Sequence, residues 1–191
     1  MSAKLSWDER YRRGEHLSDS PAPLIAKAVE KIHPGRALDL ACGAGRHALF
    51  LAERVWRVTA VDASRVAIET VQKQARQRGL NVDARVVDLE KHEFEIQPQS
   101  FDLICDCYYL QRDLFPAIRD GVRPGGIVIA IIHIGDDSSD VKPMNPDFLL
   151  QPGELRRFFA GWEIEHEFEG KPADAPHQRA VAEIVARRPI A

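Results

Sequence analysis

The sequence has no long apolar run, few cysteines and no excess of charge of either sign, and each lack excludes a class of protein. No segment approaches the roughly 20 apolar residues of a membrane span. Residues 1–16 contain no apolar signal region. The cysteines, Cys42, Cys105 and Cys107, are odd in number and lack the spacing of a disulfide framework, which favours reduced thiols in a cytoplasmic protein. A net charge of −3 gives nothing that attracts nucleic acid or an anionic membrane.

What the sequence does contain is the composition of one packed domain. Its 191 residues are 45% hydrophobic and 29% charged, which suits a single core of ordinary size. Helices are expected at 24–32, 45–53, 65–78, 114–122 and 152–159, and strands at 36–43, 56–62, 82–88, 101–109, 127–134, 162–170 and 179–188. Residues 123–126, Arg-Pro-Gly-Gly, are expected to form a turn.

The order of these elements predicts the fold class. Strands that alternate with helices indicate a parallel sheet, whereas the last two strands are joined by a loop too short for a crossover helix and should pair antiparallel. We expect an α/β fold with a doubly wound, mostly parallel seven-stranded sheet and a C-terminal antiparallel hairpin. Residues 1–20 lie outside this pattern and are interpreted as a lid segment, with residues 21–191 as the single domain.

The most informative segment is the first expected strand and the glycine loop that follows it. Gly43 and Gly45 let backbone approach a ligand, and ligands of open α/β sheets bind beyond the carboxyl ends of the strands. Gly43-x-Gly45-x-x-Ala48 also fits a dinucleotide fingerprint. Asp39 weighs against that interpretation, because a carboxylate within this strand repels a pyrophosphate and stabilises a cation. The alternative is that Asp39 accepts from backbone donors in the loop.

Carboxylates also end the next two expected strands. Asp62 can accept both hydroxyl hydrogens of a ribose, and the alternative is a helix N-cap, a role that Ser64 fills better. Asp88 can receive an adenine amino group while the Leu89 amide contacts the ring, and the alternative is an ordinary loop aspartate. Acidic residues at the ends of three successive strands are more specific than any one of them.

These motifs together resemble the class I S-adenosylmethionine-dependent methyltransferases. The resemblance runs from about residue 36 to residue 128 and rests on LDLACGAGRHA, VTAVDAS, VVDLE, FDLICDCYYL and RPGG. Within that superfamily the chain is similar to the tellurite-resistance-type and thiopurine-methyltransferase-like small-molecule group, through Trp7-Asp8-x-x-Tyr11 and the tail QPGELRRFFAGWEIEHEFEG. One departure is Ala41, where many relatives have the first glycine of the loop.

The resemblance implies S-adenosylmethionine as the cofactor and assigns residues to it by position. They are Asp39, Ala41, Gly43 and Gly45 for the methionine part, Asp62 and its neighbour Ala63 for the ribose, and Asp88 and Leu89 for the adenine. Trp7 and Tyr11, four residues apart, are expected to cover the sulfonium through cation–π attraction, or else to pack plainly against the domain. The substrate pocket is expected to include Asp106, Tyr108, Tyr109, Arg112 and His133.

No catalytic residue can be named, because methyl transfer from a sulfonium needs alignment and exclusion of water more than a protein base. His47 and His133 are candidate bases, and their alternative is a helix-dipole or strand-end contact. The three cysteines are either ligands for a soft metalloid substrate or small buried hydrophobes. No metal site is expected.

The expected partner is a small-molecule methyl acceptor, with a thiol and a metalloid oxyanion as candidates, and the chain is expected to be a monomer or a homodimer. No Asn-Pro-Pro-Tyr-like motif follows the fourth expected strand, which disfavours methylation of nucleic-acid amines. Two alternatives stay open. One is a non-catalytic module that binds S-adenosylmethionine or S-adenosylhomocysteine, and the other is an NAD-type oxidoreductase.

Overall fold

Seven strands form a sheet of order β3-β2-β1-β4-β5-β7-β6 in the computed structural model, which describes residues 6–15, 17–136, 144–172 and 179–190. Pairings β1–β2, β2–β3 and β4–β5 are parallel, and β5–β7 and β6–β7 are antiparallel. The predicted fold class is therefore confirmed. By internal contacts the chain divides into two compact units, residues 1–21 with 34–95 and residues 22–33 with 96–191. Each unit is described by itself.

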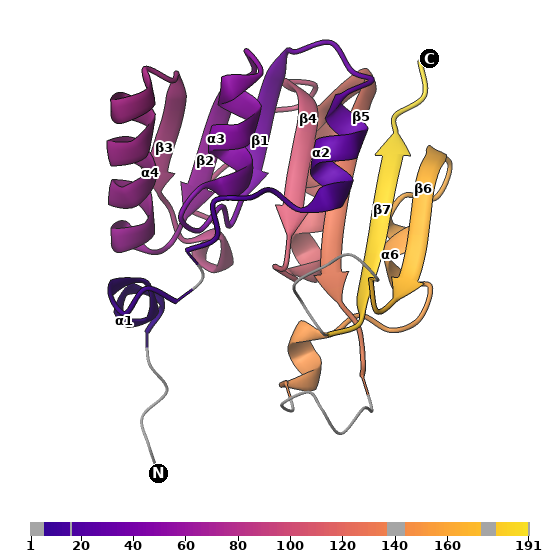
Figure 1. Ribbon diagram of the computed structural model, residues 1–191. Coiled ribbons are helices and arrows are strands. Elements are labelled where there is room, and N and C mark those ends of the chain that lie inside the picture. Colours follow the sequence, from indigo (N-terminus) through magenta and orange to yellow (C-terminus); the bar gives the residue numbers. More distant parts are fainter. Residues whose placement is uncertain (1–5, 16, 137–143, 173–178, 191) are drawn as a thin grey trace. The chain divides into compact units, whose positions relative to one another are not determined.

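The first unit contains three parallel strands and the helices that follow them (Figure 1). Its elements are α1 (Trp7–Arg12), β1 (Arg36–Leu40), α3 (Arg46–Glu53), β2 (Arg57–Asp62), α4 (Arg65–Arg78), β3 (Val82–Val86) and the 3-10 turn η1 (Leu89–Lys91). The interior of β1 is buried, and its residues Ala37 to Leu40 pair with Val58 to Val61 of β2. The carboxyl ends of β1 and β2 therefore lie side by side.

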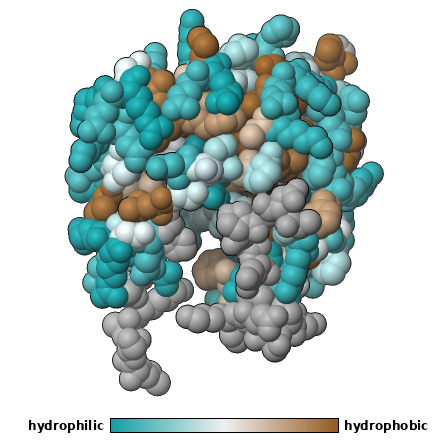
Figure 2. All heavy atoms as spheres, viewed as in Figure 1, coloured by the Kyte–Doolittle hydropathy of each residue, from teal (hydrophilic) through white to brown (hydrophobic). Residues whose placement is uncertain are grey.

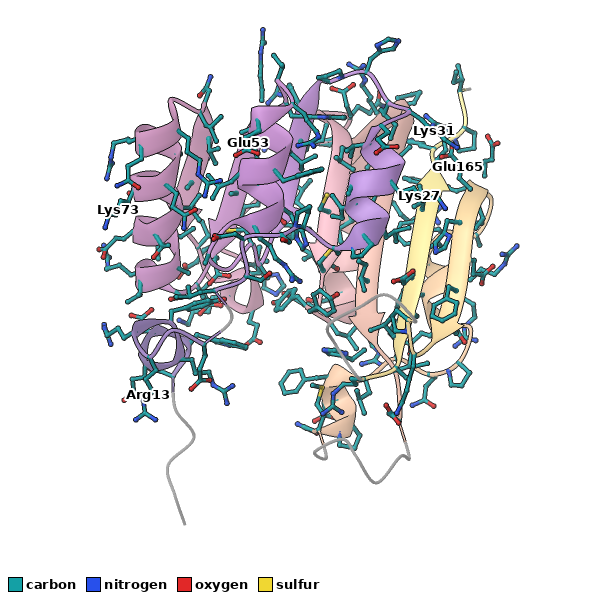
Figure 3. The ribbon with its side chains drawn as sticks, in the orientation of Figure 1. Arg13, Lys27, Lys31, Glu53, Lys73 and Glu165 are labelled. Carbon is teal, nitrogen blue, oxygen red and sulfur yellow. The ribbon has the colours of Figure 1, made fainter. Side chains whose placement is uncertain are left out.

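Helix α4 shows why the sequence places its ends so sharply. The Ser64 hydroxyl accepts a hydrogen bond from the Ala67 amide at 3.2 Å, and Gly79 closes the helix in the left-handed conformation, as predicted. The helix buries one apolar face, which includes Ile68 and Val71. Lys73, on the opposite face, points away from the sheet (Figure 3).

The second unit contains the remaining parallel pair and the antiparallel hairpin. Its elements are α2 (Pro23–Val29), β4 (Phe101–Cys107), η2 (Arg112–Leu114), α5 (Phe115–Gly121), β5 (Val122–His133), η3 (Pro146–Phe148), α6 (Glu154–Phe158), β6 (Glu163–Gly170) and β7 (Val181–Arg187). Every residue of β4 is buried, and so is the apolar run of β5 from Ile127 to Ile132. Such continuous burial is typical of strands covered on both faces.

Several element boundaries differ from the sequence-based expectation by one to three residues, and the start of β5 differs by five. Strand β5 begins at Val122 rather than Ile127, because residues 123–126, expected as a turn, form an irregular stretch of the strand. In that stretch the Gly125 amide donates to the Arg188 carbonyl at 2.9 Å. Helix α2 ends at Val29, before the expected residue 32. At the start of β5 the hydrogen bond between Gly125 and Arg188 outweighs the local turn pattern.

The outermost strand, β6, alternates charged and half-buried residues along its length. Its exposed positions include Glu165 and Glu167, which form ion pairs with Arg187 and Arg156 respectively. On the face that Figure 2 shows, hydrophilic residues predominate and the hydrophobic ones form separate patches. Among the described residues no helix is long and apolar enough to cross a membrane.

Candidate functional site

The first unit contains a buried carboxylate at the end of β1. Asp39 is only 1% exposed, and neither of its carboxylate oxygens has a hydrogen-bond partner among the described residues. Burial raises the pKa of Asp39 to about 7. The Ala48 amide, whose geometry falls short of an ordinary hydrogen bond, and the Arg46 guanidinium offset this effect only in part. A carboxylate that is desolvated and unpartnered is costly to the fold. It therefore suits a ligand that brings a cationic donor, such as an ammonium group.

The loop after β1 bends through several residues with positive φ. Ala41 has φ 47°, Gly43 has φ 55° and Gly45 has φ 85°. The left-handed region costs an alanine roughly 1–2 kcal/mol and a glycine almost nothing, so the departure at Ala41 carries some strain. A hydrogen bond within the loop, from the Gly45 amide to the Cys42 carbonyl at 3.0 Å, holds this turn together despite that cost.

The two glycines of this loop meet different neighbours. A Cβ added to Gly43 would lie 2.6 Å from the Tyr11 hydroxyl, so the backbone there is approached by helix α1. A Cβ added to Gly45 would lie 2.6 Å from a methyl group of Val71 on α4. Gly45 is thus required for packing between the loop and α4, a role that the motif alone does not reveal. Because Gly43 has no side chain, the Tyr11 hydroxyl can lie close to the backbone of the loop.

Asp62 organises the loop through both of its carboxylate oxygens. One oxygen accepts from the Gly43 amide and the other from the Ser64 amide, each at 2.8 Å. Burial raises the pKa of Asp62, and these two bonds lower it in part. A carboxylate accepts about four hydrogen bonds, so lone pairs remain for the predicted contact with ribose hydroxyls. Ala63, between Asp62 and Ser64, is exposed.

Asp88 stands at the start of the 3-10 turn that follows β3. Its carboxylate accepts from the Glu90 amide at 3.1 Å and pairs with the Lys91 ammonium at 2.7 Å, and this pairing is the main cause that lowers the pKa of Asp88. Leu89 is buried beside it. The arrangement fixes the Leu89 backbone, and the contact of both residues with an adenine stays a prediction.

Helix α1 brings the two predicted aromatic residues together in the first unit. The Trp7 and Tyr11 rings have centroids 6.1 Å apart, and Trp7 is 56% exposed whereas Tyr11 is half-buried. Burial, with a contribution from Asp62, raises the pKa of Tyr11. Residues 1–5 and 16 of the expected lid lie outside the described residues. Tyr11 therefore stands next to the glycine loop, while Trp7 faces solvent.

The sequence analysis missed Asp8, which attaches α1 to α4. The Asp8 carboxylate accepts from the Ser64 hydroxyl at 2.5 Å and from the Val66 amide at 3.4 Å. The signal was present in the motif Trp7-Asp8-x-x-Tyr11, where the acidic residue lies between the aromatic ones. The motif alone does not reveal this contact, because Ser64, the partner of Asp8, is 56 residues away in the chain.

The residues predicted for the substrate pocket all lie in the second unit, near the ends of β4 and β5. Asp106 is buried in β4. Tyr108 follows that strand with a positive φ of 64°, and its ring centroid is 5.5 Å from that of His133. The Tyr109 hydroxyl donates to the Gln111 side chain at 2.6 Å. Strained backbone of this kind often occurs at ligand sites, and the pocket itself stays a prediction.

Arg112, also predicted for the pocket, has its guanidinium engaged within the second unit. It binds both carboxylate oxygens of Glu154, at 2.7 and 3.1 Å, and donates to the carbonyls of Asp147 and Leu149. This pairing lowers the pKa of Glu154. Arg112 thus joins η2 to η3 and α6, and a bidentate pair of this type fixes geometry as well as charge.

The remaining chemical candidates are buried. His47 is 4% exposed, and burial lowers its pKa to about 3, so the imidazole is neutral at ordinary pH. Cys42, Cys105 and Cys107 are all buried and none forms a disulfide, and burial raises the pKa of Cys42 well above its usual value. Within the described residues no group of three or more His, Cys, Asp or Glu side chains could hold a metal ion.

Comparison with known proteins settles the family. The family model described as "Tellurite resistance protein TehB" matches residues 9–171, most of the chain. The chain belongs to the TehB family. This confirms the resemblance inferred from the motifs.

Relatives of this TehB-family chain include two larger curated proteins. It is 29% identical over 162 residues to "Hemagglutinin 1" of Eikenella corrodens, covering 81% of this chain and 52% of that protein. It is 24% identical over 148 residues to a "Probable S-adenosyl-L-methionine-dependent methyltransferase TehB" of Haemophilus influenzae, covering 73% and 50%. The chain thus spans about half the length of the curated relatives it matches.

A solved structure supports the fold. The crystal structure of TehB from Haemophilus influenzae superposes with a TM-score of 0.77 at 21% identity, over 95% of this chain and 67% of that one. The likeness extends over nearly the whole TehB-family chain.

Proposed function

We propose that this TehB-family chain catalyses methyl transfer from S-adenosylmethionine to a small-molecule acceptor. The observation that carries the proposal is Asp39, a buried carboxylate with two unpartnered oxygens at the end of β1. S-Adenosylmethionine carries an ammonium group, which supplies the donors that this carboxylate lacks. A dinucleotide brings a pyrophosphate instead, so the same carboxylate disfavours the NAD-type alternative.

The other residues of the first unit fit the rest of the cofactor. Asp62 keeps acceptor capacity for ribose hydroxyls after binding Gly43 and Ser64. Asp88 and Leu89, which follow the next strand, are the residues proposed to contact the adenine. The bound cofactor supplies the activated methyl group. The task left to the protein is to align donor and acceptor and to exclude water.

We infer that the acceptor is a soft nucleophile, of which a thiolate and a metalloid oxyanion are the candidates. The support is that neither histidine considered as a general base is well suited to that role. His47 is buried and neutral, and His133 is packed against the Tyr108 ring. A soft anion needs no general base, whereas a hydroxyl or an amine often does. Asp106, Tyr108, Tyr109 and Arg112 remain the residues proposed to surround the acceptor. We further propose that the protein has no nucleic-acid or membrane partner. It is proposed to be cytoplasmic and to be a monomer or a homodimer.

The test has a binding arm and a turnover arm. Titration with S-adenosylhomocysteine should give a Kd in the micromolar range, about −8 kcal/mol. The protein with S-adenosylmethionine is then screened against thiols, tellurite, selenite and small carboxylic acids for release of S-adenosylhomocysteine. Binding without turnover of any acceptor would favour a non-catalytic module, and binding of NAD without S-adenosylhomocysteine would refute the proposal. Asp39→Asn serves as the matched variant.

A further inference from the structure

Helix α1 is too short and too exposed to hold its own position. It has six residues, Trp7–Arg12, and none of them is buried. Isolated helices shorter than about 12 residues are marginal in water, so α1 depends on contacts with the rest of the first unit. A capping box between Ser6 and Glu9 supports the helix locally but attaches it to nothing. Its docking must therefore come from a few specific side chains.

Asp8 supplies the polar part of that docking. Its carboxylate accepts from the Ser64 hydroxyl at 2.5 Å and from the Val66 amide at 3.4 Å, at the end where α4 begins. These bonds, the Ser64 bond first, lower the pKa of Asp8. A carboxylate at a helix N-terminus is also favoured by the helix dipole. Figure 1 shows α1 next to that end of α4.

Tyr11 supplies the other contact, three residues further along the same helix. Residues at this spacing lie on one face of a helix. The face of α1 on which Asp8 contacts α4 is therefore also the face on which Tyr11 contacts the glycine loop. The Tyr11 hydroxyl reaches the space beside Gly43, 2.6 Å from where a Cβ would stand. The position of Tyr11 over the glycine loop is thus tied to the bond that Asp8 makes.

The two contacts are also joined through the cofactor site. Ser64, the partner of Asp8, donates its amide to Asp62, and Asp62 accepts the Gly43 amide with its other oxygen. The contacts form a closed circuit: Asp8, Ser64, Asp62, Gly43 and, through helix α1, Tyr11. A displacement of α1 therefore acts on both the ribose carboxylate and the methionine loop.

We propose that Asp8 is a positioning residue of the cofactor site, which docks α1 on α4 and so holds Tyr11 closed over the glycine loop. The inference rests on the proposed function, because it takes the loop to be the place of the cofactor. Release of the Asp8–Ser64 bond frees α1 and opens the loop for cofactor exchange.

The test compares Asp8→Ala with Glu15→Ala, which removes a carboxylate from the same segment. Glu15 pairs only with Arg10, at 3.7 Å, among the ion pairs of the described residues. A hydrogen bond to a charged group that is partly exposed should change docking by roughly tenfold when lost. In the ligand-free protein, the amides of residues 10–15 should exchange about tenfold faster in Asp8→Ala, and S-adenosylhomocysteine should bind about tenfold more weakly and leave faster.

Further readouts separate positioning from general stability. The melting temperature of Asp8→Ala should fall by no more than about 2–4 °C, which is what a tenfold loss corresponds to in a chain of this size. Asp8→Asn keeps an acceptor oxygen and should recover part of the loss, and Glu15→Ala should change neither exchange nor affinity. If Asp8→Ala leaves exchange unchanged, Asp8 does not dock the helix. If exchange quickens at unaltered affinity, α1 does not close the site. If the wild type binds no S-adenosylhomocysteine, the proposed function fails as well.

Discussion

Replacing Asp39 with asparagine should stabilise the folded protein at alkaline pH while it destroys cofactor binding. Burial holds the pKa of Asp39 at about 7, against 3.8 for an exposed aspartate. Between these values the folded state keeps a proton that the unfolded state has lost, so the free energy of unfolding falls as the pH rises. The loss is about 1.4 kcal/mol per pH unit and on the order of 4 kcal/mol in all, complete above pH 7.

Asparagine is nearly the same size and never carries this charge. It does bury an amide with unmade hydrogen bonds, which costs about 1–3 kcal/mol. The net gain at pH 8 should therefore be about 1–3 kcal/mol, and at pH 5, where most of the penalty to the wild type is absent, the gain should vanish or change sign. Affinity for S-adenosylhomocysteine should fall about a hundredfold or more, because the partner of a buried charge is removed.

Urea unfolding of both proteins at pH 5 and pH 8 measures the effect. Asp102→Asn is the matched control, since Asp102 is also buried but forms an ion pair with Arg123. That substitution should destabilise the protein at pH 8, opposite in sign to Asp39→Asn. Equal destabilisation by Asp39→Asn at both pH values would refute the reasoning, because it would mean that the carboxylate is satisfied in solution.

Three other changes test the same site. Affinity for S-adenosylhomocysteine should rise with pH by up to about tenfold per unit below pH 7 and level off above it, since an ammonium ligand favours ionised Asp39; calorimetry in two buffers should show a proton released on binding, and a flat profile would contradict this. Asp62→Ala should weaken cofactor binding and lower the free energy of unfolding, each by about 1–3 kcal/mol, because it frees two loop amides; a change in stability alone would make Asp62 purely structural. Gly45→Ala should destabilise by about 2–4 kcal/mol through its clash with Val71, whereas Gly79→Ala, also at positive φ but with nothing within 4 Å, should cost only about 1 kcal/mol; similar losses in thermal unfolding would show that packing at Gly45 is unimportant.

Local chemistry made much of the fold predictable. Ser64 and Gly79 bound α4 as expected, because N-caps and left-handed C-caps depend on residues within one turn. The alternation of strands and helices gave the parallel sheet, and the short final connection gave the hairpin. The predicted start of β5, at Ile127, was wrong, because the hydrogen bond between Gly125 and Arg188 joins residues far apart in sequence.

For the candidate site, the sequence indicated candidate residues but not the contacts that join them, and their binding of a cofactor stays a prediction. Asp39 stood out because a carboxylate inside an apolar strand is rare. The bond from Ser64 to Asp8 and the contact of Gly45 with Val71 did not, since each depends on how a helix docks. The second role of Asp62, as acceptor for loop amides, was likewise hidden, because backbone donors leave no mark in the sequence.

The alternation along β6 has a consequence for how the protein behaves at high concentration. A sheet's last strand offers unpaired backbone groups on which another chain can grow, and charged side chains on that strand oppose such growth. Here a second copy that paired its own β6 with this strand would bring the exposed carboxylates of Glu163, Glu165 and Glu167 close to like charges. These charges, which contribute little to folding stability, therefore oppose growth of the sheet by a second copy, and high salt, which screens them, is the condition in which that barrier is lowest.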